Sequence, residues 1–114
     1  MKLFWVYLAV VALLVAGGCG GAKPDLEAVC ARAEQGDTLA QRALALRYFN
    51  GDGVEKNFVE AYKWCLIAEA LAREPVSTTS KKIAKHLTAA QLADAQAQAQ
   101  QWQQDFQAIP HAKP

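Results

Sequence analysis

The chain has 114 residues, of which 53% are hydrophobic and 20% are charged. This length and composition suit one small domain behind a leader segment. The formal net charge is only +1, which argues against nucleic-acid binding, because that function depends on a strongly basic face. The only local excess of positive charge is the group Lys81, Lys82, Lys85 and His86, which is interpreted as a solvated helix face.

Residues 1–18 have the form of a secretory signal peptide. Lys2 is followed by an uncharged run from Leu3 to Val15, and small residues then lead to Cys19. A positive start, an apolar middle and a small-residue exit are typical of such signals, and the run is too short to span a bilayer comfortably. The segment is therefore expected to be a targeting signal and not part of the folded domain.

The sequence around Cys19 resembles the signal of a bacterial lipoprotein, in which the cysteine directly follows small residues. The resemblance implies lipid attachment to the Cys19 sulfur, cleavage after Gly18, and a short tether over residues 19–24. It also implies the bacterial cell envelope, facing the periplasm, and favours the outer membrane because Gly20 follows the cysteine. Two or three acyl chains give stable anchoring. Ordinary cleavage near Ala22, giving a soluble periplasmic protein, and an uncleaved anchor are the alternatives.

Five helices are expected after the tether, and their ends carry recognisable signals. Asp25 is the expected N-cap of the first, Gly36-Asp37 separates the first from the second, and Glu74-Pro75 ends the third, because a residue before proline avoids helical geometry. Residues 76–80 are expected as a polar connector. The expected helices run to about Gln35, to about Asn50, from about Phe58 to Arg73, to about Leu87, and from Thr88 to about Gln107.

The second and third of these helices carry small and aromatic residues at helical spacing. One stripe consists of Ala40, Leu44 and Tyr48, and the other of Ala61, Trp64, Ala68 and Leu71. Alanine allows two helix axes to approach closely, while the aromatic rings fill the volume beside them. Gly51 is the expected left-handed cap, and Asn57 with Glu60 is a capping-box-like start. The pattern predicts an antiparallel pair of helices joined by a loop of about six residues.

Further apolar residues lie off these stripes and predict neighbours on two sides of each helix. They are Leu39, Leu46 and Phe49 on the second helix, and Phe58, Tyr62 and Leu66 on the third. Phe49, Phe58 and Tyr62 are also candidates for an exposed interaction patch.

This arrangement resembles a Sel1-like repeat, a relative of the tetratricopeptide repeat, over about residues 36–73. The resemblance rests on Ala40, Leu44, Ala45, Tyr48, Gly51, Gly53, Val54, Ala61, Trp64 and Ala68. Residues 83–96 are also similar to the tail that follows the last repeat in bacterial members. The family implies an all-α, short solenoid of helix hairpins over residues 25–107, with capping helices at about 78–107. Residues 108–114, which contain two prolines, are expected to form a flexible tail. The family also implies an adaptor that holds another protein, with no enzyme activity, cofactor or metal.

Two cysteines remain besides Cys19. Cys30 and Cys65 are 65 − 30 = 35 residues apart, about one repeat length, so they fall at nearly equivalent places on successive helices of the same type. If both side chains point into a shared interface, a disulfide is possible. The alternative is two buried thiols that act as small hydrophobic residues.

The sequence offers little for catalysis or metal binding. His86 and His111 are isolated, the hydroxyl residues from Ser77 to Ser80 have no matching His and Asp, and Gly51-x-Gly53 lacks the Lys-Ser/Thr of a phosphate loop. We therefore expect an exported protein-interaction module or adaptor in the bacterial cell envelope. A small periplasmic enzyme or ligand-binding protein, and a purely structural anchor, are the alternatives.

Overall fold

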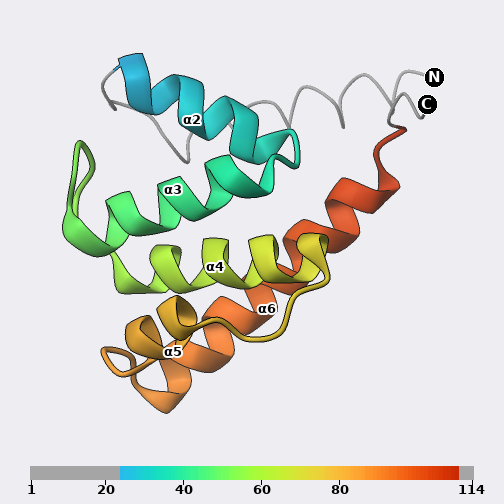
Figure 1. Ribbon diagram of the computed structural model, residues 1–114. Helices are drawn as coiled ribbons and strands as arrows, with labels where there is room; N and C mark the ends of the chain where they lie inside the picture. The colour runs from blue at the N-terminus through green and yellow to red at the C-terminus, as the bar shows by residue number, and fades with distance from the viewer. Residues whose placement is uncertain (1–23, 111–114) are drawn as a thin grey trace, which may run out of the picture.

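A computed structural model describes residues 24–110, and within this range the protein has five α-helices and no strand (Figure 1). The helices are α2 (Pro24–Glu34), α3 (Thr38–Asn50), α4 (Phe58–Ala72), α5 (Thr78–Ala84) and α6 (Ala89–Ala108). The expected all-α class is confirmed for this part of the chain. The predicted signal peptide, Cys19, most of the tether and His111 lie outside the described residues.

Several helix ends are fixed by residues that the sequence identified. The Asp37 carboxylate accepts hydrogen bonds from the N–H groups of Leu39 and Ala40 at the start of α3. Gly51 ends that helix in the left-handed conformation, with φ of 69°. Thr88 and its partner Gln91 form a complete capping box at the start of α6. Local polar side chains thus decide where these helices begin and end.

The start of α4 departs from the expected capping box. Asn57 is the N-cap, and its side chain accepts from the N–H of Glu60. Its own N–H donates to the Tyr48 carbonyl at 2.9 Å. The backbone group that a returning glutamate would satisfy is therefore bound to the end of α3, and this bond ties the two helices together.

Some boundaries differ from the sequence expectation. α2 begins at Pro24, so Asp25 lies in its first turn and is not the N-cap; proline suits this place because its missing N–H would be unpaired there. α4 ends at Ala72, with Arg73 as a left-handed cap. α5 begins at Thr78 because Ser77 caps it, so part of the expected connector is helical.

The helices share one core built around α3 and α4. α3 packs against both α2 and α4, whereas α5 and α6 pack against α4 (Figure 1). Trp64 is only 3% exposed, as expected. The other stripe residues also lie in the interior: Ala40, Leu44, Ala45, Tyr48, Ala61 and Ala68 are buried, and Val54 packs against the core at its edge. The small-residue stripes therefore form the contact between central helices.

As expected, α3 has neighbours on two sides, α2 and α4, but the expectation that Leu39 and Leu46 form these contacts was wrong. Leu39 is 74% exposed and Leu46 is 48% exposed, whereas Phe49 is half-buried. Helices α2 and α4 already occupy the sides of α3 that carry Leu44 and Ala45. The two leucines point away from both contacts.

Helix α6 connects distant parts of the chain. The Trp102 ring meets the edge of Trp64 at a centroid distance of 5.7 Å and stacks on Phe106 at 4.9 Å. The Trp102 Nε1–H donates to Glu34 Oε2 at 3.0 Å, and the Phe106 ring lies against Gly36 at the turn between α2 and α3. α6 therefore crosses α4 and reaches the first helix.

Candidate functional site

One helix presents apolar side chains to solvent. Leu39 and Leu46 are seven residues apart on α3, so they share a face, and the half-buried Ala43 lies between them. We call these three residues the Leu39 face. The other large exposed apolar residues of the described chain, Val76 and Ile109, lie singly outside the helices. The Leu39 face is therefore the most continuous candidate for binding an apolar surface of another protein.

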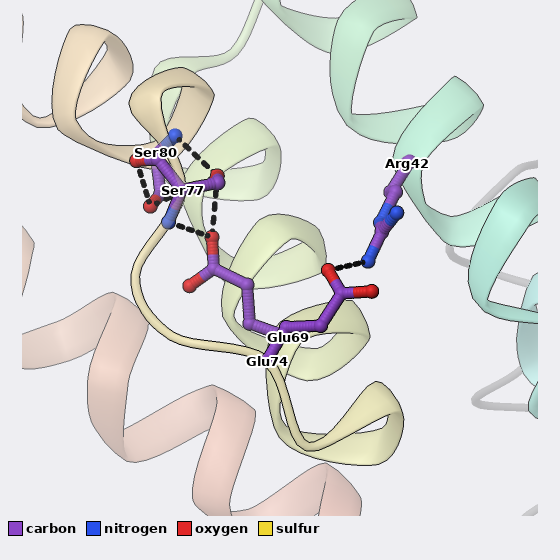
Figure 2. Close-up of polar contacts among 5 residues, drawn as sticks. All are labelled: Arg42, Glu69, Glu74, Ser77 and Ser80. Carbon is purple, nitrogen blue, oxygen red and sulfur yellow. Dashed lines mark hydrogen bonds and ion pairs between the residues drawn. The ribbon is translucent and has the colours of Figure 1, made fainter.

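Polar contacts hold the segment that follows α4 against α3 and α4 (Figure 2). Arg42, on α3 between the two leucines, forms an ion pair with Glu74 from the segment that follows α4. In that same segment, Ser77 donates to the buried Glu69 carboxylate through its N–H at 3.0 Å and its hydroxyl at 2.6 Å. The connection between α4 and α5 is thereby held beside the C-terminal end of α4.

The serines between α4 and α5 have structural partners. The Ser77 hydroxyl also accepts from the N–H of Ser80 at 3.1 Å, and the Ser80 hydroxyl donates to the Ser77 carbonyl at 3.1 Å. These bonds cap α5 and satisfy the buried Glu69. The hydroxyl-rich turn expected from the sequence is thus a helix start built on a buried carboxylate.

A second surface lies where the loop between α3 and α4 meets the end of α5. His86 stacks on Phe58 at a centroid distance of 4.5 Å and meets Phe49 edge-on at 5.4 Å. The Lys56 ammonium lies 5.8 Å from the Phe58 ring, and the Lys82 ammonium lies 5.7 Å from the Phe49 ring. Both distances are within the range of cation–π attraction.

We call this group the lysine–phenylalanine surface. It consists of Phe49, Phe58 and His86 with Lys56, Lys81, Lys82 and Lys85. None of these lysines has an ion-pair partner within residues 24–110. In the loop, Asp52 pairs with Arg47, and Glu55, which precedes Lys56, has no ion pair among the described residues. Tyr62, the third aromatic candidate from the sequence, is buried and does not belong to the surface.

Titratable groups with raised pKa lie in the interior and not on these surfaces. Burial raises the pKa of the Glu34 carboxyl, and the hydrogen bond from Trp102 opposes this effect. Burial likewise raises the pKa of Tyr48, with smaller contributions from Glu60 and Glu34. The cause in each case is removal from water. This pattern is typical of packing at the junction of α2, α3 and α6.

The proposed disulfide between Cys30 and Cys65 is absent, because Cys65 is a free, buried thiol. Burial raises the pKa of Cys65 to about 12. The physical reason is the order of packing: α3 lies between α2, which carries Cys30, and α4, which carries Cys65. Successive helices of the same type are therefore not direct neighbours. Cys65 acts as a small hydrophobic residue of the core.

The described part of the chain has neither a candidate metal site nor a candidate membrane-spanning helix. Within residues 24–110 no three His, Cys, Asp or Glu side chains gather closely enough to hold a metal ion. None of the helices α2 to α6 combines the length and apolar character needed to cross a bilayer.

Comparison of the chain with protein-family models, with curated proteins and with solved structures found no match. The Sel1-like resemblance therefore stays a prediction from the residues quoted above. The sequence did not identify the Leu39 face, because an exposed leucine on a helix has no local signal that separates it from a packed one. The lysine–phenylalanine surface was visible only in parts, as a charge run and as separate aromatic residues.

Proposed function

We propose that this chain is an exported, lipid-anchored, Sel1-like helical-repeat protein that acts as a protein-interaction module in the bacterial cell envelope. The observation that carries the proposal is the Leu39 face, an apolar stripe left open on the central helix α3. Leu39 and Leu46, with exposures of 74% and 48%, are the only large aliphatic side chains of helices α2 to α6 that are exposed; the others are buried or half-buried.

The packing of α3 supports recognition of a partner by this face. Its backbone is held by α2 on one side, by α4 on the other, and by the Arg42–Glu74 ion pair. A rigid helix face loses little conformational entropy on binding, and leucines spaced by seven residues fit an apolar groove or a second helix. The partner is therefore expected to offer an apolar groove of about two helical turns.

The proposal is tested by site-specific photocrosslinking in intact cells. A photoreactive residue at Leu39 or Leu46 should give one discrete adduct with an envelope protein, and Leu46→Glu should abolish the adduct formed from position 39. Gln96, which is exposed on α6, is the control position. Equal adducts from position 96, or no adduct from either leucine, would contradict the proposal. An adduct with a second copy of this chain would show self-association instead.

The alternative of a small enzyme receives little support from the titratable groups. Glu34, Tyr48 and Cys65 have raised pKa values, but burial is the largest cause for each. A thiol with a pKa of about 12 is protonated at neutral pH and is a poor nucleophile. These groups are better explained as parts of the core than as catalytic residues.

A further inference from the structure

We propose that the lysine–phenylalanine surface faces the membrane and binds anionic phospholipid headgroups. This inference rests on the proposed lipid anchor at Cys19. It adds an orientation for the domain: the end with the loop between α3 and α4 lies on the bilayer, and the Leu39 face stays free on the side of α3.

The first argument is that the start of the domain and the surface lie at the same end of the molecule. Arg47 pairs with Asp25 at the start of α2 at 3.4 Å and contacts Asp52 in the loop at 4.0 Å. Leu26 also lies against Gly53 of that loop. Figure 1 shows the beginning of α2 and the loop on the same side of the molecule.

The tether is too short to separate this end from the bilayer. Pro24 follows Cys19 by 24 − 19 = 5 residues, and five residues span at most about 18 Å when fully extended. A lipid on Cys19 would therefore hold the start of α2, and the loop beside it, within a short distance of the headgroups. The lysine–phenylalanine surface adjoins the same loop through Lys56 and Phe58.

The second argument is the chemistry of the surface. From Pro75 to Ala93 the sequence contains three lysines and one histidine but no acidic residue. Lys56, Lys81, Lys82 and Lys85 are exposed, and none has an ion-pair partner among the described residues. Lysines beside half-buried aromatic rings suit the headgroup region, where the ammonium groups meet phosphates and the ring edges reach the acyl boundary.

An acidic segment of another protein could also neutralise these lysines. The position of the surface beside the start of α2 favours the bilayer, because a short anchor brings anionic lipid to it at high effective concentration. The Leu39 face, which carries no such charge, is the more suitable place for a protein partner.

The test uses the full-length lipidated protein, reconstituted in vesicles and labelled with an environment-sensitive dye at a single introduced cysteine. Thr79→Cys places the dye at an exposed position of α5, beside the lysine–phenylalanine surface. Gln104→Cys places it at an exposed position near the C-terminal end of α6, away from that surface. Native Cys65 is buried, which shields its thiol from the label, and Cys30 is buried and disulfide-bonded. The vesicles contain phosphatidylcholine alone or with about 30% phosphatidylglycerol, which gives a negative surface potential. A headgroup spin-labelled lipid quenches dyes that lie near the bilayer.

We expect at least about twofold stronger quenching at position 79 than at position 104 in the anionic vesicles, and loss of this difference at about 0.5 M salt, where charges are screened. Lys81→Gln with Lys82→Gln should remove the difference. The control variant, Arg32→Gln with Arg73→Gln, removes two positive charges outside the lysine–phenylalanine surface. It should leave the quenching difference between positions 79 and 104 unchanged.

The outcomes separate this inference from the anchor on which it rests. Flotation of the protein with phosphatidylcholine vesicles, and its loss in Cys19→Ser, report the anchor alone. If the protein floats but the two dyes are quenched equally, or if phosphatidylglycerol has no effect, the membrane-facing surface is overturned. Crosslinks from position 79 to an acidic envelope protein, lost in the Lys81→Gln and Lys82→Gln variant, would overturn it in favour of a protein partner.

Discussion

Gln41 shows how a single polar residue can be buried at a cost. It lies on α3 with 0% exposure, and its Nε2–H donates to the Ala33 carbonyl at 2.9 Å. Its Oε1 is buried and has no hydrogen-bond partner among the described residues. The Ala33 carbonyl also accepts from the N–H of Gly36 at 3.1 Å. An apolar side chain of similar length would therefore leave no backbone group unpaired at this site.

Gln41→Met is expected to raise the free energy of unfolding by up to about 1 kcal/mol, because the unpaired amide oxygen is removed while the volume is kept. Urea denaturation followed by circular dichroism measures the change. Gln96→Met, on the exposed side of α6, is the control and should shift stability by less than about 0.5 kcal/mol. A clear loss of stability in Gln41→Met would show that the oxygen has a partner, such as a buried water.

The raised pKa of Glu34 makes its contribution to stability depend on pH. Burial raises the pKa of its carboxyl above the ordinary value of 4.5, so the folded protein favours the protonated form. This contribution is fully present below the ordinary pKa and is lost as the pH rises through the folded pKa. Glutamine resembles the protonated acid, and its Oε1 can still accept from Trp102.

Glu34→Gln is therefore expected to be more stable than the native chain at pH 7, and this advantage should shrink when the pH is lowered to 4. Urea denaturation at the two pH values measures the difference. Glu27→Gln, on an exposed position of the same helix, should show no comparable pH dependence. An advantage of equal size at both pH values would argue against a raised pKa.

At the level of the helices, α3 and α4 both end in a left-handed cap, but the two caps use different residues. Gly51 ends α3 with φ of 69°, and Arg73 ends α4 with φ of 56°. Glycine adopts this conformation readily, whereas a residue with a Cβ loses about 1 kcal/mol or more. The second cap is thus formed by an unfavourable residue, held by hydrogen bonds from the N–H groups of Arg73 and Glu74 to Ala70 and Glu69.

Arg73→Gly is expected to raise the free energy of unfolding by about 0.5 to 1 kcal/mol, since the backbone strain is removed. Gly51→Ala should lower it by about 1 kcal/mol or more, because the new Cβ would enter a strained conformation 3.3 Å from the Lys56 Cβ. Thermal and urea denaturation of both variants provide the measurement. A gain in the free energy of unfolding for Arg73→Gly together with a loss for Gly51→Ala would support the two left-handed caps. A loss of stability in both variants would contradict them.

Helix existence and most helix ends could be predicted from the sequence, because caps act within four residues. Asp37, Asn57 and Thr88 each satisfy an N–H group three residues ahead. The packing side of α3 could be predicted only in part. Its alanines and Leu44 were correctly placed inside, but Leu39 was not, since the sequence cannot say that α2 and α4 leave that side of the helix uncovered.

At the scale of the whole molecule, α6 joins regions that are far apart in the chain. Trp102 contacts Trp64 and Phe106 through its ring and Glu34 through its Nε1–H. In a simple stack of repeats each unit contacts only its neighbours. Here α6 also reaches α2, so the described helices should unfold as one cooperative unit.

Trp102→Ala is expected to lower the free energy of unfolding by about 2 to 4 kcal/mol, because a half-buried aromatic contact and a hydrogen bond are lost together. Trp102→Phe keeps the ring contacts and should cost about 1 kcal/mol. Fluorescence and circular dichroism should report coincident urea transitions for the native protein. Separate transitions would show that α6 melts independently of α2.

The lysine–phenylalanine surface also belongs to this scale, and this explains why the sequence indicated its members only as separate residues. The lysine–phenylalanine surface combines Phe49, Phe58 and His86 from three segments. Contact among such distant residues follows from the crossing of α3, α4 and α5. The failed prediction of a bridge from Cys30 to Cys65 has the same origin, because spacing along the chain does not reveal which helix lies between two others.

The bond between Trp102 and Glu34 spans 68 positions of the chain. Because synthesis proceeds from the N-terminus, α6 is made after α2. The contacts of Trp102 with Glu34 and of Phe106 with Gly36 therefore cannot form until the C-terminal turns of α6 have been synthesised. Until then, the Trp64 indole lacks its contact with the Trp102 ring and stays more exposed to solvent. Synthesis through residue 102 must therefore precede closure of the interior, and nascent chains that end before that residue should remain sensitive to proteases.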